Sequence, residues 1–296
     1  MQRKQAGENK KAILYAVLAA AFYAISSPCS KLLLRHISSA MMAGFLYLGA
    51  GIGMFLLTAF QVTVRKKSMN DERLTKKELP YTIAMVGLDI LAPIFLMIGL
   101  KKSSAANVSL LNNFEIVATT LIALFLFHEA VSKRLWAAIG LITVSSILLS
   151  VEGIESFQFS YGSIFVLLAC ICWGFENNCT RMIAGKSPSQ IVIIKGIGSG
   201  IGSLMIALTI GDQFPKPTYM LAALLLGFVA YGLSVFFYVL AQRHLGASKT
   251  SAYYAIAPFI GVVLSFLILY EMPNLSFVIA TVIMIAGTWL VSKEEA

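Results

Sequence analysis

Long apolar runs alternate with short polar links over the whole chain. Ten such runs can be counted, each close to the roughly 20 residues that an α-helix needs to cross a bilayer. They cover approximately residues 12–34, 40–64, 80–100, 104–127, 133–151, 161–184, 188–210, 217–241, 247–270 and 274–292. None shows the period-2 alternation of a membrane β-barrel. The pattern predicts an all-α integral membrane protein with ten transmembrane helices.

The two halves of the chain resemble each other. With a shift of 150 residues, 23–31 align with 173–181, and Lys31 falls on Arg181. With a shift of 142, residues 99–105 align with 241–247, and apolar runs end in Glu129 and Glu271. Five helices per copy is an odd number of crossings, so the copies have opposite orientation. We expect two inverted five-helix repeats, residues 1–151 and 152–296, with a substrate site between them near mid-membrane.

Composition agrees with a chain embedded in lipid. It is 58% apolar and 12% charged, against about 25% charged in a soluble domain. The net charge of +9 comes from basic residues in short loops, without a basic face interleaved with aromatic residues. We therefore expect the lipid bilayer and a small-molecule solute as partners, and no nucleic acid.

The loop charges also predict an orientation. With the N-terminus in the cytoplasm, seventeen Lys and Arg residues lie on the inner side and five on the outer side. Cytoplasmic loops carry the excess of Lys and Arg in membrane proteins. We expect a multi-pass protein of the plasma (inner) membrane with both termini cytoplasmic. A cleaved leader is not expected, because no small-residue cleavage site follows the polar lead.

Cysteine and histidine offer no reaction centre. Cys170 and Cys172 lack the paired spacing of a zinc site, and the four cysteines all lie in apolar runs. The three histidines lie at segment ends on different sides of the membrane. We expect no cofactor, no metal and no enzymatic activity. A pore would need a continuous polar lining, whereas the polar residues here are clustered.

Four ionisable residues fall well inside the apolar runs: Asp89, Glu115, Glu176 and Lys195. Charge at that depth is costly and marks a functional site by default. Three acids against one lysine leave an excess of two negative charges if all ionise. Either carboxyls stay protonated or a cation joins them. We predict a charge or proton-coupling network from these four residues.

The sixth run carries Trp173, Glu176 and Asn177 at helical spacing. As a binding wall, it would offer an aromatic surface, a charge and an amide to a solute. The alternative is that Glu176 pairs with Lys195 and joins two helices. Lys195 itself is followed by Gly198, Gly200 and Gly202, which would serve internal packing or a dimer contact, so a monomer and a homodimer both stay open.

The fourth run carries Asn112 and Glu115 on one polar stripe. It would line the same site, or form a hydrogen-bonded seam between helices. Tyr231 and Tyr254 could add aromatic walls to the site, or belong to the interfacial belt. Pro28 and Pro258 are candidate break points in the first and ninth runs.

Several motifs together resemble the ten-helix EamA-type branch of the drug/metabolite transporter superfamily. They are Trp173-Gly174, Leu245-Gly246-Ala247, Ala257-Pro258 and the closing Glu129 and Glu271. The first copy departs from the family pattern, with Tyr23-Ala24 in place of Trp-Gly and Phe114-Glu115-Ile116 in place of the proline region. The resemblance implies alternating access of a solute, often an amino acid or similar metabolite and commonly outward, through a cavity lined by helices one, three, four, six, eight and nine.

Residues and resemblance lead to one functional expectation. The chain is expected to be a secondary active transporter, an exporter of a small polar metabolite such as an amino acid or amine. Coupling would be to protons or to the solute gradient alone. The alternative within transport is an importer of an organic cation such as choline, which acidic and aromatic residues would also suit.

Overall fold

The computed structural model describes residues 2–65, 74–128, 131–151, 160–183, 186–245 and 253–294. Glu129, Gly246 and Ala247, which the repeat singled out, lie outside them. The described elements are α1 (Gln2–Ala24), α2 (Ser26–Leu33), α3 (Ser39–Arg65), η1 (Lys76–Glu78), α4 (Leu79–Lys102), α5 (Ala105–Leu111), α6 (Phe114–Phe127), α7 (Lys133–Ser150), α8 (Tyr161–Met182), α9 (Pro188–Thr209), α10 (Pro217–Gly227), η2 (Phe228–Leu233), α11 (Ser234–Leu245), α13 (Ala257–Leu269) and α14 (Leu275–Glu294).

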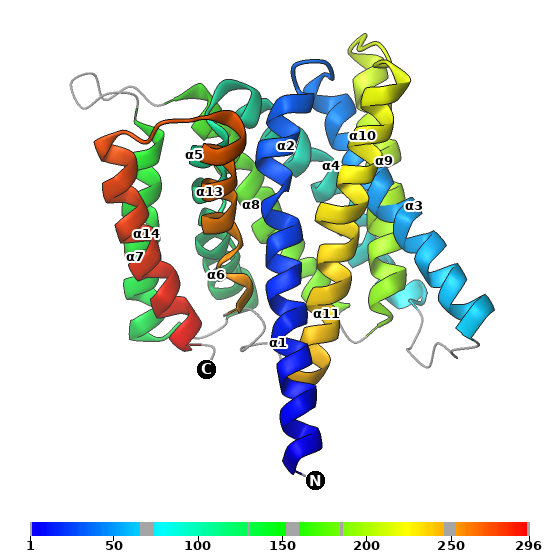
Figure 1. The fold of residues 1–296 in the computed structure, drawn as a ribbon, viewed down its shortest axis with the longest axis horizontal. Helices are drawn as coiled ribbons and strands as arrows, with labels where there is room; N and C mark the ends of the chain where they lie inside the picture. Colours follow the sequence, from blue (N-terminus) through cyan, green and yellow to red (C-terminus); the bar gives the residue numbers. More distant parts are fainter. Residues whose placement is uncertain are drawn as a thin grey trace.

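The prediction of an all-helical membrane protein is confirmed. Within the described ranges, nine helical stretches are long and apolar enough to span a bilayer, and α13 is a shorter apolar helix. The α7–α14 pair forms one edge of the bundle, while α3, α9 and α10 form the other (Figure 1). Helix α8 packs against both α4 and α6. The start of α1 and the end of α14 lie at the same end of the bundle (Figure 1).

Four of the apolar runs are not single regular helices, and the sequence predicted a break in two of them, the first and the ninth. The ninth has a turn at Ala255 and Ile256 before α13. The first breaks at Ile25, and the fourth breaks at Asn112 and Asn113. The eighth contains a π-helical turn, η2, between α10 and α11. Pro28 and Pro258 stand in the first turns of α2 and α13, where a helix does not need the missing N–H. The prolines therefore mark helix starts that follow the breaks.

The break in the fourth run occurs without proline. Asn113 donates from Nδ2 to the carbonyl oxygen of Leu110 at 3.1 Å. The backbone N–H groups of Asn113 and Glu115 bond three residues back, to Leu110 and Asn112, as in a tightened turn. Asparagine side chains compete with the regular helix ladder for backbone groups, which explains the break here.

The glycines of α9 pack inside the chain. A Cβ atom on Gly196 would lie 2.4 Å from the backbone nitrogen of Gly51 in α3, so only glycine permits this approach. On another face, Gly198 lies against Val86 of α4. Close backbone approach through small residues is a usual way for membrane helices to associate. This stripe is therefore used for contacts within one chain.

Candidate functional site

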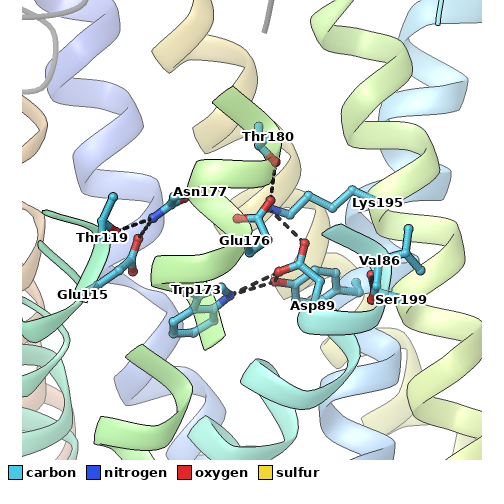
Figure 2. A network of polar contacts seen from close by, with 11 residues as sticks. Val86, Asp89, Glu115, Thr119, Trp173, Glu176, Asn177, Thr180, Lys195 and Ser199 are labelled. Carbon is cyan, nitrogen blue, oxygen red and sulfur yellow. Dashed lines mark hydrogen bonds and ion pairs between the residues drawn. The ribbon is translucent and has the colours of Figure 1, made fainter. Parts of the chain in front are cut away.

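Helix α8 places polar side chains on two sides. Consecutive helical residues point about 100° apart, so Glu176 and Asn177 face different neighbours. Figure 2 shows Trp173 and Glu176 directed toward Asp89 and Lys195, with Asn177 directed toward Glu115 and Thr119. The sequence-predicted residues of the sixth run thus serve two separate polar groups.

The first group is an ion cluster shared by three helices. Lys195 of α9 places its Nζ 3.0 Å from Asp89 Oδ2 on α4 and 3.0 Å from Glu176 Oε1 on α8. Asp89 is 0% exposed and Glu176 1% exposed, whereas the Lys195 side chain retains 26% exposure. The pairing of Glu176 with Lys195, left open by the sequence, is present, and Asp89 joins it. Two acids on one lysine leave a net negative charge if both ionise.

Two neutral donors complete the surroundings of Asp89. Its Oδ1 accepts from the Tyr47 hydroxyl at 2.9 Å and from the Trp173 indole N–H at 3.2 Å. Thr180, one turn along α8, donates its hydroxyl to Glu176. Trp173 is 6% exposed, so its N–H orients Asp89 and does not stand free for a solute.

The second group centres on Glu115 of α6. Asn177 Nδ2 donates to Glu115 Oε1 at 2.7 Å and to Thr119 Oγ1 at 3.2 Å. Gly174 lets α8 come this close to α6, since a Cβ there would lie 2.8 Å from the Cβ of Ala118. Among the described residues no lysine or arginine pairs with Glu115. Asp89 and Glu176 are paired with Lys195, whereas Glu115 has no ion-pair partner among the described residues.

Tyrosine rings form a third part of the site. The ring centroids lie 5.5 Å apart for Tyr47 and Tyr231, 5.9 Å for Tyr23 and Tyr231, and 6.0 Å for Tyr23 and Tyr254. Ser26 donates to the Tyr231 hydroxyl at 3.2 Å. The rings therefore form a row that starts at Tyr47, which is bonded to Asp89. Tyr23 lies at the end of α1, Tyr231 in η2 and Tyr254 just before α13.

Sequence reasoning missed three of these residues as parts of the site: Tyr23, Ser26 and Tyr47. Tyr47 lies in an apolar run with no nearby ionisable residue to draw attention to it. In the internal alignment Tyr23 is the counterpart of Trp173. This alignment is the sequence feature that indicates a site role for Tyr23, because it sets an aromatic residue of each half at an equivalent position.

The Asn112 side chain makes no hydrogen bond to either polar group among the described residues. It is 8% exposed, and its Oδ1 has no hydrogen-bond partner among the described residues. Its backbone oxygen lies 3.8 Å from the thiol of Cys170. The sequence placed Asn112 and Glu115 on one stripe of a continuous helix, whereas the structure has a helix break between them. The described residues also contain no cluster of three or more His, Cys, Asp or Glu side chains suited to a metal ion.

The model of the EamA-like transporter family matches this chain twice, at residues 10–151 and 160–293. The chain belongs to the EamA-like transporter family. It is therefore a multi-pass membrane transporter. A relative from the archaeon Methanothermobacter thermautotrophicus, described as an uncharacterized transporter, is 24% identical over 289 residues, which is 93% of this chain and 84% of the relative.

A solved crystal structure shares the fold of this EamA-like transporter. The TM-score is 0.65 at 14% sequence identity, and the match covers 94% of this chain and 96% of the other. The helical arrangement is thus one found in an experimental structure.

Proposed function

We propose that this EamA-like protein is a secondary active transporter that exports a small polar metabolite carrying an amino or ammonium group, such as an amino acid or amine. The observation that supports this is Glu115. Its carboxylate is held by Asn177 at 2.7 Å and has no ion-pair partner among the described lysines and arginines. A bound ammonium group would supply the missing charge.

The tyrosine rings suit the same kind of solute. A cation over the face of an aromatic ring gains electrostatic attraction of about 0.5–2 kcal/mol, the larger value when water is excluded. Tyr23, Tyr231 and Tyr254 therefore would contact the solute, with Asn177 orienting it beside Glu115. Trp173 would act through Asp89, because its indole N–H is already bonded there.

The Asp89–Lys195–Glu176 cluster is the proposed coupling element. With Glu115, these residues sum to three negative charges and one positive charge. A cationic solute on Glu115 and a proton on Asp89 or Glu176 would make the interior neutral. When the cationic solute leaves on one side and a proton binds from that side, the net charge of the interior stays the same. This charge balance is the one expected for exchange of a cationic solute against a proton.

Transport would proceed by alternating access of two inverted repeats, residues 1–151 and 152–296. Broken helices at the site are a common feature of such carriers, and α1/α2 and α5/α6 are both broken beside it. The excess of inner-side Lys and Arg orients both termini to the cytoplasm of the plasma membrane. Export then means passage from the end that holds the termini to the opposite end.

The test is ligand-dependent stabilisation of the purified protein. Amino acids, primary amines and choline-like cations would be screened, because a ligand raises the unfolding temperature according to its occupancy. The ligand found should bind Glu115→Gln at least about tenfold more weakly, which corresponds to about 1.4 kcal/mol. Glu78→Gln, at the start of α4, is the matched control and should bind normally. Equal binding by Glu115→Gln would refute the assignment.

The tyrosine rings also support a second candidate, an importer of a quaternary cation such as choline. A quaternary ammonium cannot donate a hydrogen bond to Glu115 and would depend on the rings. Tyr254→Leu would then weaken binding more than Glu115→Gln does, whereas a primary amine predicts the opposite order.

A further inference from the structure

The junction between α4 and α5 lies at the end of the bundle opposite the termini (Figure 1). A cation and an anion hold it from two sides. Lys31, near the end of α2, donates from Nζ to the carbonyl oxygens of Leu100, Lys101 and Ser103 at 2.5, 3.2 and 2.6 Å. The three donors of its ammonium group are thus all directed at the C-terminal end of α4.

Glu271 holds the other side of the junction. Its carboxylate oxygens accept from the backbone N–H groups of Ala105 and Ala106 at 2.7 and 2.8 Å. These are first-turn amides of α5, which have no partner within the helix. We call the contacts of Lys31 and Glu271 with the α4–α5 junction the latch.

Each charge of the latch matches the helix end that it contacts. The C-terminal end of a helix carries a partial negative charge and the N-terminal end a partial positive charge. Lys31 meets the former and Glu271 the latter. Within the described part of the chain, Lys31 has no carboxylate within ion-pair distance, so its contacts are with backbone dipoles.

The latch ties the α4–α5 junction to α2 and to the link after α13, at the end of helices that also pack against one another, since α13 contacts both α5 and α2. The junction is fixed to α8, because a Cβ on Gly162 would lie 2.0 Å from Ser103 Oγ and one on Gly99 would lie 2.7 Å from the oxygen of Gly162. Glu271 instead follows α13, and Lys31 belongs to α2. Lys31 and the junction belong to the first proposed repeat, and Glu271 to the second.

These contacts can open without unfolding the helices. Ser104 already accepts from the N–H of Asn107 at 3.1 Å and so caps α5 by itself. Lys31 and Glu271 are partly exposed at the end of the bundle, where water can replace backbone partners. The latch is therefore reversible in a way that interlocked apolar side chains are not.

The internal alignment repeats both charges. It sets Lys31 against Arg181 and Glu271 against Glu129. A basic residue in the last turn of the first apolar run and an acid after the fourth run thus occur in each half of the chain. Charges that recur in both halves are expected of a device that an alternating carrier needs at each end.

We infer that the latch closes the end of the transporter opposite its termini and opens once in every transport cycle. This rests on the proposed alternating access. In the structure described here both sets of contacts are formed, so the latch is closed. Opening requires the link after α13 to separate from the α4–α8 pair.

The experiment measures that separation directly. Spin labels would be placed at Tyr161→Cys and Met272→Cys, which are 76% and 91% exposed, after the four native cysteines are replaced by alanine. Tyr161 starts α8 and Met272 follows Glu271. The distance between the labels therefore reports on the latch, whatever the solute.

Lys31→Met and Glu271→Gln should each raise the ratio of long to short label distances about tenfold, since a hydrogen bond to a charged group is of that strength. Lys101→Met removes an exposed charge at the same end and should leave the distribution unchanged. Unchanged distances in both latch variants, or an equal change in Lys101→Met, would overturn the inference.

A measurement on the unaltered protein covers the case in which a variant fails to fold. An opening latch predicts that the amides of Ala105 and Ala106 exchange hydrogen faster than those of Leu110 and Leu111 in the same helix. Equal, slow exchange across α5 would overturn the inference. If solute binds while the distance between the labels stays fixed, the latch is contradicted and the proposed function stands. If the distance changes but none of the screened solutes binds, the latch stands and the proposed function is contradicted.

Discussion

Lys195 decides the electrostatics of the site, because it is 3.0 Å from two carboxylates that are almost completely buried. Buried ions are stabilised only while their partners and hydrogen bonds are in place, and removal of one partner leaves an uncompensated charge. Asp89 has Tyr47 and Trp173 in addition, whereas Glu176 has Thr180. Besides Lys195, Asp89 therefore has two side-chain hydrogen-bond donors and Glu176 has one.

Lys195→Met should lower the free energy of unfolding by about 3–5 kcal/mol, the usual cost of breaking a buried ion pair. Asp89→Asn added to the same chain should recover part of that loss, because one of the two facing charges disappears. Denaturant titration in detergent would measure both. Lys102→Met, an exposed lysine at the end of α4, serves as the control. A double variant no more stable than Lys195→Met would show that charge repulsion is not the cause.

At the scale of elements, close helix contacts and helix breaks position the site. Gly196 brings α9 against α3, which presents Lys195 to α4 and α8. The break at Asn112 and Asn113 ends α5 and starts α6 just before Glu115. Glu115 consequently stands in the first turn of a helix, where an acid is favoured by the helix dipole.

Gly196→Ala should destabilise the protein by about 1–3 kcal/mol, the usual cost of overpacking, since its Cβ would meet the backbone of Gly51. Gly87→Ala is the matched control: it lies in α4 with no atom within 4 Å of the added Cβ. The control should be neutral or more stable by about 0.4–1 kcal/mol. Thermal unfolding in detergent compares the two, and similar losses in both would contradict the packing argument.

At the scale of the whole molecule, the start of α1 and the end of α14 share one end of the bundle (Figure 1). From the loop charges we propose that this end faces the cytoplasm. Epitope tags on the N- and C-termini should therefore both resist protease in intact cells and both be cut in permeabilised cells. A tag that is cut in intact cells would contradict the proposed orientation. The direction of transport that we call export, which is defined by that orientation, would then be contradicted as well.

Hydropathy was sufficient to predict an all-helical membrane protein, because it reports the preference of each segment for the bilayer over water. The transfer of about 20 apolar residues into a bilayer is favourable whatever the rest of the chain does. For the same reason Asp89, Glu115, Glu176 and Lys195 could be named from the sequence, since a charge in such a run is costly wherever its partner lies. The breaks at Pro28 and Pro258 were also predictable from local backbone chemistry.

The partners of those charges were decided only by the tertiary structure. Lys195 could have paired with any of three acids, and helix packing gave it Asp89 and Glu176 while leaving Glu115 to Asn177. Tyr47 meets Asp89 across 42 residues of sequence. The proline-free break that separated Asn112 from Glu115 was not predicted either. Such pairings depend on which helices touch and at what rotation, and hydropathy and periodicity do not specify either. The sequence by itself determined which residues could not rest in lipid alone, and the packing of the helices determined where each of them found a partner.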